Sequence, residues 1–209
     1  MEVYVIRHGE STANAEQRFS GWSQVPLTEL GREQARRTGE RLKGLVFDRI
    51  FSSDQLRARE TTELVFPGRE YTTDWRIREL NIGSVLEDRL RDEAVVEYGE
   101  VLTTAMVTRD FSPFGGENLT MHLERVSKFM DDLAAIPDDE QIAIVCHGGS
   151  ILSMLSYVVG FEIKQTAVTV ENASVTCFRR QDGKWRLLKW SDTGDVVCAN
   201  GPAAKSYAN

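Results

Sequence analysis

The sequence predicts an α/β fold with a mostly parallel central sheet between two layers of helices. Short apolar runs and longer helical patterns alternate along the chain, the order that builds a three-layer α/β/α sandwich. Two of the runs, residues 2–7 and 142–146, each lead directly into a histidine followed by a glycine. Near the end, Asp182-Gly183 separates two further runs and is typical of the turn in an antiparallel hairpin. We therefore expect a sheet that is parallel except for a C-terminal antiparallel hairpin.

The first third of the chain is expected to contribute two strands and two helices. Residues 2–7 form a buried strand, and a helix opened by Thr28 ends near Gly44. A second short strand follows at residues 47–51. Residues 52–54 are expected to cap the next helix, which runs through Phe66 and is stopped by the proline after it.

The rest of the chain begins with its least regular portion, residues 70–118. Helical pieces are expected there at residues 87–98 and 100–108. Asn118 caps the next helix, because apolar residues recur after it at spacings of three and four until Pro137. The remaining expected elements are a strand at 142–146, a helix at 150–159, and hairpin strands at 174–180 and 184–190.

The length of 209 residues suits one α/β domain with a full core. We expect a single domain over residues 1–199 with a small insertion or cap at about 84–114. Residues 200–209 are small and polar and are interpreted as a short tail.

The charge balance narrows the range of partners. With a net charge of -7, nucleic acid and anionic membranes are unlikely electrostatic partners, and no apolar run is long enough to cross a bilayer. An anionic substrate must then be attracted by a local cluster of positive groups. The three cysteines form no C-x-x-C pair, which favours free thiols and a cytoplasmic location.

Polar residues gather at the expected strand tips. Arg7 and His8 end the first strand, Arg57 lies in the first turn of the helix after the second, and His147-Gly148 ends the later strand. The carboxyl ends of parallel strands are where open α/β sheets bind ligands. Two guanidinium groups, two imidazoles and helix-terminal N–H groups together suit a tetrahedral oxyanion, which indicates a phosphoryl group.

Phosphoryl chemistry at such a site requires a nucleophile and an acid. Neutral imidazole is a good nucleophile near pH 7, so a histidine can accept the phosphoryl group. The leaving alkoxide needs a proton, and Glu79 is the best-placed carboxylic acid, with Glu10 and Glu87 as nearby alternatives. Core packing is the alternative interpretation of the two strand-tip histidines, and His122 is expected to be an exposed helix residue.

These motifs, taken in order, resemble those of the histidine phosphatase superfamily, which contains cofactor-dependent phosphoglycerate mutases and phosphatases. Each motif is short, but the ordered set extends from residue 3 to about 190. The resembling segments are Arg7 to Glu10 with Asn14, Gly21, Pro26 to Gly31 with Gln34-Ala35, Ser52 to Thr61, Glu79 with Gly83, Gly115 to Glu117, and His147 to Gly149.

The resemblance implies a phosphoglycerate mutase-like fold and a role for each matching residue. The catalytic residues would be His8, which forms a phosphohistidine, Glu79, which protonates the leaving oxygen and then activates water, and His147. The resemblance implies no metal and no other cofactor. The substrate-binding residues would be Arg7, Asn14, Gly21, Arg57 and Gly148.

The departures from the family pattern bear on the substrate. Gln24 and Phe114 replace a common aspartate and proline, and residues 84–88 lack the common W-E-G. The segment 84–114 is short, leans acidic and offers no matching arginine pair, which favours a phosphatase acting on a small phosphorylated metabolite. A cofactor-dependent phosphoglycerate mutase is the alternative, followed by a phosphoprotein-directed phosphatase or regulatory module. The oligomeric state is left open, with a homodimer as one candidate.

Overall fold

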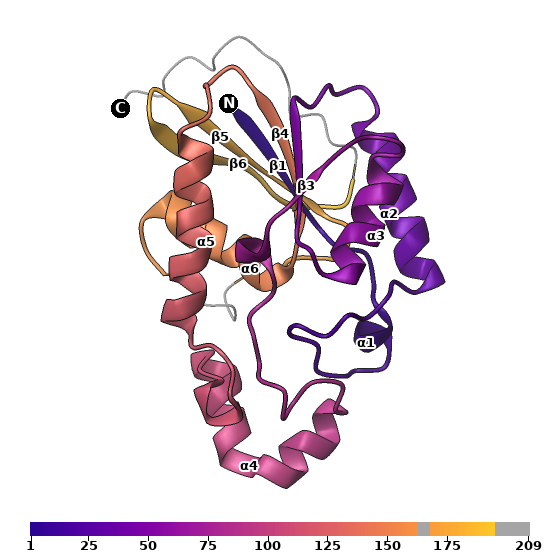
Figure 1. The fold of residues 1–209 in the computed structure, drawn as a ribbon, viewed down its shortest axis with the longest axis vertical. Coiled ribbons are helices and arrows are strands. Elements are labelled where there is room, and N and C mark those ends of the chain that lie inside the picture. Colours follow the sequence, from indigo (N-terminus) through magenta and orange to yellow (C-terminus); the bar gives the residue numbers. More distant parts are fainter. Residues whose placement is uncertain (163–167, 195–209) are drawn as a thin grey trace.

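A computed structural model of the chain describes residues 1–162 and 168–194. These residues form a six-stranded sheet in the order β3-β2-β4-β1-β5-β6 (Figure 1). The pairs β1–β4, β2–β4 and β2–β3 are parallel, whereas β5 is antiparallel to both β1 and β6. The predicted mixed sheet is thereby confirmed. The strands are β1 (Glu2–Arg7), β2 (Arg49–Ser52), β3 (Thr72–Thr73), β4 (Gln141–Cys146), β5 (Val175–Gln181) and β6 (Lys184–Asp192).

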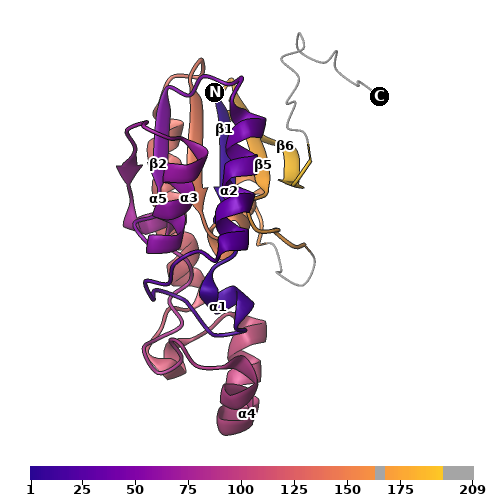
Figure 2. The same ribbon diagram turned by 90° about the vertical axis from the view of Figure 1, so that its right-hand side faces the viewer.

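Alternation of side chains along the strands creates the two outer layers. In β1, Val3 and Val5 pack on one face with α5 (Leu119–Ala134) and α6 (Gly148–Val159). Tyr4 and Ile6 pack on the opposite face with α2 (Glu29–Leu42) and α3 (Leu56–Val65). Figures 1 and 2 show these helix pairs on opposite sides of the sheet, so the predicted sandwich is confirmed.

Two of the three predicted helix caps are confirmed. Thr28 accepts a hydrogen bond from the N–H of Gly31 at 3.0 Å, and Asn118 accepts one from Met121 at 2.9 Å. The predicted cap at residues 52–54 is wrong: α3 begins at Leu56, and its N-cap residue makes no side-chain cap bond. Ser52 is still paired within the sheet, which delays the start of the helix.

The region between β3 and α5 is more regular than its sequence predicts. It contains η1 (Trp75–Ile77), α4 (Arg91–Thr108) and η2 (Ser112–Phe114). The two predicted helical pieces form α4, which starts later than expected and is interrupted at Gly99. Figures 1 and 2 both place α4 beyond the carboxyl edge of the sheet. The short helix α1 (Thr12–Ala15) was not predicted. The predicted tail at 200–209 lies outside the described residues.

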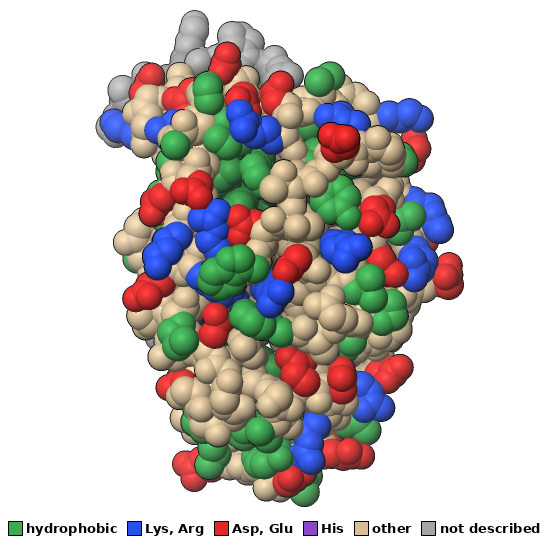
Figure 3. All heavy atoms as spheres, in the orientation of Figure 1, with side chains coloured by type: hydrophobic (Ala, Val, Ile, Leu, Met, Phe, Trp, Pro, Cys, Tyr) green, Lys and Arg blue, Asp and Glu red, His purple; other side chains and the backbone are tan. Residues whose placement is uncertain are grey.

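The surface carries charges of both signs. Figure 3 shows acidic and basic side chains interleaved over one face, with no continuous patch of a single sign on that face. No helix within the described part of the chain is long and apolar enough to cross a membrane.

Candidate active site

The parallel strands bring the predicted site residues to one edge of the sheet. Arg7 at the end of β1 lies opposite Cys146 at the end of β4, so the histidines that follow the two strands are neighbours. The ring centroids of His8 and His147 are 5.1 Å apart. Arg57 reaches the same point from α3, and the three side chains are at most 3% exposed.

The hydrogen bonds of His8 define which ring nitrogen carries the proton and which carries the lone pair. Its Nδ1 lies 2.7 Å from the carbonyl oxygen of Gly9, which can only accept, so Nδ1 carries the proton. Nε2 therefore presents a lone pair, and the Nε–H of Arg57 donates to it at 3.3 Å. Burial, followed by the positive charges of Arg57 and Arg7, holds the pKa of His8 well below its ordinary value. The imidazole is neutral at pH 7, the form that acts as a nucleophile.

Two buried guanidinium groups supply positive charge beside this imidazole. Arg57 donates its remaining hydrogen bonds to backbone carbonyls, and burial lowers its pKa to about 10, which still leaves it charged at neutral pH. Arg7 donates to the carbonyl of Val170, and its buried Nε has no partner among the described residues. Neither arginine lies within ion-pair distance of a described carboxylate, and the charge of Glu79 acts on both from further away.

His147 supplies a third polar group at the same edge. Its Nε2 lies 2.9 Å from the hydroxyl of Ser53, and its Nδ1 has no partner among the described residues. Burial and the charge of Arg57 hold the pKa of His147 well below its ordinary value. Gly148 begins α6 beside Arg7, so the start of a helix also lies in this region.

The carboxylate of Glu79 is fixed against the start of α6. It accepts hydrogen bonds from the backbone N–H of Gly149 at 3.1 Å and of Leu80 at 2.8 Å. A side chain on Gly149 would collide with it, because a Cβ there would lie 2.1 Å from Glu79 Oε1. The carboxylate is thereby held in one place by backbone groups.

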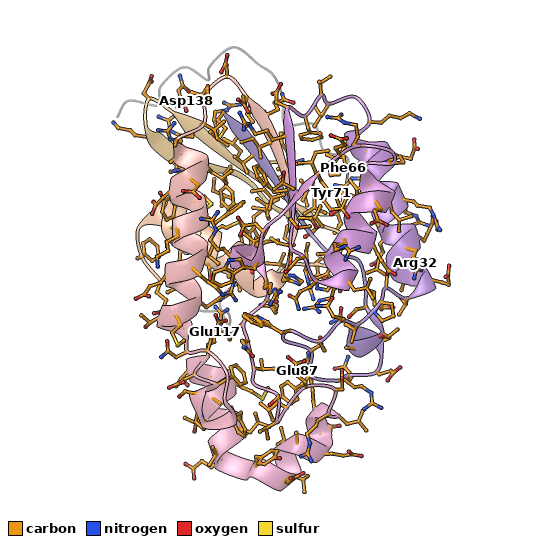
Figure 4. All side chains as sticks on the ribbon, in the orientation of Figure 1. Arg32, Phe66, Tyr71, Glu87, Glu117 and Asp138 are labelled. Atoms are coloured by element: carbon orange, nitrogen blue, oxygen red, sulfur yellow. The ribbon has the colours of Figure 1, made fainter. Side chains whose placement is uncertain are left out.

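The backbone of Glu79 is held by residues that the sequence did not single out as site residues. Its N–H donates to the buried side chain of Gln55 at 3.0 Å, and its carbonyl accepts from Arg125 and Trp22, both at 2.8 Å. Arg125 also forms a two-pronged pair with Glu117, at 2.8 and 2.9 Å. Figure 4 shows Glu117 at the end of α5 nearer to α4. The sequence could have indicated Arg125 through its spacing, which places it on the buried stripe of α5.

Asn14 and Gly21, the remaining predicted substrate-binding residues, already form hydrogen bonds within the fold. The side-chain oxygen of Asn14 accepts from the N–H of Ser11 at 3.2 Å, within the cap of α1. The carbonyl of Gly21 accepts from Arg57 at 3.0 Å. The N–H of Gly21 and the next two N–H groups donate to the carboxylate of Glu87, which Figure 4 shows in the segment leading to α4.

Two cavities meet at Glu79. One of about 410 Å³ is lined by Arg7, Gly148 and Gly149, and one of about 200 Å³ is lined by Gly21 and Arg109; Glu79 lines both. The larger cavity is lined by two arginines, Arg7 and Arg91, and by two carboxylates, Glu79 and Glu171, and it shares Arg91 and Gly149 with the smaller one.

His122 lies behind the smaller cavity and corrects an expectation from the sequence. It is 0% exposed, whereas an exposed helix residue was predicted. Its Nδ1 lies 3.3 Å from the hydroxyl of Ser153 and 3.4 Å from Arg109 Nη2. The helix carries it on the same buried stripe as Arg125.

Residues 3–193 match the family model of the histidine phosphatase superfamily (branch 1). The chain belongs to the histidine phosphatase superfamily. The resemblance noted in the sequence is confirmed, and the chain is an enzyme of the phosphatase and mutase type.

Members of the superfamily with different names resemble this chain. A protein of Salmonella paratyphi A named "Probable phosphoglycerate mutase GpmB" is 32% identical over 210 residues, which cover 97% of each chain. The mycobacterial glucosyl-3-phosphoglycerate phosphatase shares 25% identity and a TM-score of 0.79, covering 91% of this chain and 98% of its own. The α-ribazole phosphatase of Shigella flexneri, 24% identical with a TM-score of 0.86, covers 94% and 99% and shows the likeness of fold.

Proposed function

We propose that this protein is a metal-independent phosphomonoester hydrolase that acts on a small phosphorylated metabolite through a phosphohistidine at His8. The observation that carries the proposal is the state of His8. A buried neutral imidazole carries its lone pair on Nε2, where it accepts from Arg57, and neither Arg57 nor Arg7 lies within ion-pair distance of a described carboxylate. Such an arrangement suits a nucleophile that attacks an anionic phosphoryl group.

The first step transfers the phosphoryl group to the enzyme. Arg7, Arg57 and His147 hold the phosphate oxygens, helped by Asn14 and the Gly148 N–H, whereas the N–H of Gly21 is engaged by Glu87 in this structure. His8 Nε2 then attacks phosphorus, and the bond from phosphorus to the ester oxygen breaks. Glu79 gives its proton to the departing oxygen, so an alcohol leaves.

The second step releases phosphate. Glu79, now a carboxylate, takes a proton from a water molecule that attacks the phosphohistidine. The bond between phosphorus and Nε2 breaks, inorganic phosphate departs, and Glu79 is again protonated. Each proton transfer of this kind contributes on the order of 10²–10⁴ in rate.

Hydrolysis is favoured over a mutase reaction by the position of Glu87. Its carboxylate occupies the N–H groups of Gly21, Trp22 and Ser23, at 2.5–3.3 Å. These donors are therefore engaged and do not offer an anion site for the second phosphate that a bisphosphate intermediate would carry. The mutase remains the alternative, because the relative from Salmonella bears that name.

The cytoplasm is the proposed compartment. The thiol of Cys146 is buried and forms no disulfide within the described part of the chain, as is usual in a reducing environment.

The test compares wild-type protein with His8→Ala on p-nitrophenyl phosphate and on 3-phosphoglycerate. We expect wild type to release inorganic phosphate from both in the presence of a chelator, and His8→Ala to lose at least about 10³-fold in kcat/KM. Circular dichroism and a thermal melt establish that the variant is folded. Isomerisation of phosphoglycerate without phosphate release would favour the mutase, and a strict metal requirement would contradict the proposal.

A further inference from the structure

Glu87 binds a loop of the active site through backbone groups. Its carboxylate accepts hydrogen bonds from the N–H groups of Gly21, Trp22 and Ser23, at 3.1, 2.5 and 3.3 Å. Successive N–H groups that converge on one anion form a concave anion site, and hydrogen bonds to a charged acceptor are the stronger kind. In this chain the anion is a side chain of the protein itself, so these bonds fix loop 20–23.

The segment that carries Glu87 is fixed in turn by its neighbours. The N–H of Asp88 donates to the carbonyl of Phe19 at 2.9 Å, and the N–H of Phe19 donates to the carbonyl of Arg89 at 2.9 Å. Leu86 is 0% exposed within the apolar cluster that also contains Phe19. Asp88 has a left-handed backbone with φ 64°, which non-glycine residues seldom adopt. Such a conformation persists only where surrounding contacts enforce it, and it is most frequent at functional sites.

The carbonyl groups of the same loop are bound by Arg57. Its Nη1 and Nη2 donate to the carbonyls of Ser20, Gly21 and Ser23, at 3.0–3.3 Å. A guanidinium has five N–H groups, and the Nε–H of Arg57 is bonded to His8. Four of the five are therefore committed, three of them to this loop. The loop accordingly sets the direction in which the remaining N–H points.

Loop 20–23 also contacts the backbone of Glu79. The indole Nε1–H of Trp22 donates to the carbonyl of Glu79 at 2.8 Å, and the guanidinium of Arg78 lies 4.5 Å from the centroid of the indole ring. The loop thus links the arginine beside the proposed nucleophile to the proposed acid. A displaced loop would shift both groups, although Glu87 is hydrogen-bonded to neither of them within the described part of the chain.

We propose that Glu87 is a positioning residue. By fixing loop 20–23, it holds Arg57 against the phosphoryl group and Glu79 against the leaving oxygen, without contacting the substrate itself. This inference rests on the proposed function, which assigns those two tasks to Arg57 and Glu79. The carboxylate is the required group, because an amide offers one accepting oxygen in place of two and turns an NH2 toward the same N–H groups.

The first measurement is the binding of inorganic phosphate, which requires no turnover. Calorimetry compares wild type, Glu87→Gln, Arg57→Ala and the double variant. We expect Glu87→Gln to weaken phosphate binding about 10-fold, because a misplaced guanidinium loses part of a charge-assisted contact. In the Arg57→Ala background the same change should have little further effect, since the two residues act through one network. Equal losses in both backgrounds, or no phosphate binding by wild type, would overturn the inference.

The second measurement is a comparison of leaving groups, because the loop also holds Glu79. Glu87→Gln should lose more kcat/KM on alkyl phosphates than on p-nitrophenyl phosphate, whose good leaving group needs little help from an acid. A thermal melt establishes that the variant is folded. A merely structural role would lower both rates alike, and that result would overturn the link to Glu79.

Glu97→Gln is the matched control, because Glu97 lies in the same region but pairs with Arg89 at the surface. It should bind phosphate and select leaving groups as wild type does. Glu87→Asp keeps the charge and both oxygens on a shorter stem, so it should retain part of the wild-type affinity. It takes the place of Glu87→Gln if that variant does not fold. A Glu87 variant that behaves like Glu97→Gln would overturn the inference.

The two measurements separate this inference from the proposed function. Phosphate binding in which Glu87 and Arg57 are coupled supports the inference even if wild type hydrolyses no ester, a result that would reject only the proposed hydrolysis. Hydrolysis by wild type, with phosphate binding unaffected by Glu87→Gln, rejects only the inference.

Discussion

At the scale of single residues, Gly149 links the start of α6 to the chemistry of Glu79. Its N–H donates to the carboxylate, and the space where a Cβ would project is taken by Glu79 and Arg109. Both neighbours are the ends of flexible side chains, which can move without disturbing the backbone. A side chain at this position should therefore affect activity more than stability.

Gly149→Ala is predicted to stay folded, with a free energy of unfolding within about 1 kcal/mol of wild type, because alanine also favours the helix. The displaced carboxylate should lower kcat/KM by about 10²-fold or more, with the larger loss on esters that have poor leaving groups. Steady-state kinetics on aryl and alkyl phosphates, beside Glu79→Gln, provide the measurement. Gly148→Ala is the comparison, since its Cβ would meet Arg7 at an ordinary 3.6 Å and should cost less. A uniform loss across leaving groups would mean that Glu79 is not the acid.

Site residues differ in how far the sequence could indicate them. His8 and His147 follow apolar strands directly, so their meeting at one edge was predictable from local pattern. Arg109 and Gln55 gain their positions only from contacts with distant segments, for which no local pattern exists. His122 was misjudged because it is polar, although its spacing in α5 places it on the buried stripe.

At the scale of elements, α4 is divided by Gly99. This residue has φ 52° and ψ -127°, a combination open essentially to glycine, and no atom would lie within 4 Å of an added Cβ. The break lets the two halves of α4 pack around residues such as Leu102 and Ala94 below the sheet edge. Any penalty for a side chain here must come from the backbone alone.

Gly99→Ala is accordingly predicted to lower the free energy of unfolding by about 1–3 kcal/mol, the usual penalty for such a conformation. Urea denaturation gives the value, and hydrogen exchange locates the loosened segment. Glu100→Ala, an exposed substitution one residue later, should stay within about 0.5 kcal/mol of wild type. If Gly99→Ala unfolds like wild type, the break is not required by the fold.

Helix ends were predicted correctly where nearby residues determine them. They were predicted wrongly where contacts with distant segments determine them. The split at residue 99 and the caps at Thr28 and Asn118 follow from glycine and capping chemistry. The predicted start of α3 was too early, because Ser52 is still paired with β4. The residues around Ser52 do not reveal this pairing. The delayed start of α4 has a similar cause, since Glu87 is engaged with backbone N–H groups of a distant loop.

At the scale of the whole molecule, the three histidines of the chain link stability to pH. Burial holds the pKa of His8, His122 and His147 well below the ordinary value. The unfolded chain therefore binds more protons than the folded chain once the pH falls below about 6.5. The stabilising effect of the neutral rings is complete above that pH and is lost progressively below it.

We predict that the three histidines leave the free energy of unfolding unchanged between pH 7.5 and 8.5. It should fall below pH 6.5 by up to about 1.4 kcal/mol per pH unit for each histidine. Urea unfolding curves between pH 5 and 8.5 measure it. Equal stability at pH 5 and pH 7 would show that the folded protein accepts protons on these rings, contrary to their burial.

The central claim is that His8 accepts the phosphoryl group, and rapid quenching during turnover tests it most directly. Wild-type protein is mixed with p-nitrophenyl phosphate, quenched in alkali within the first turnovers, digested and mapped by mass spectrometry. We predict one phosphoryl group on the peptide that contains His8, stable in alkali, lost in acid and absent from His8→Ala. Phosphate release without a phosphorylated intermediate, or a phosphoryl group on another residue, would contradict the account.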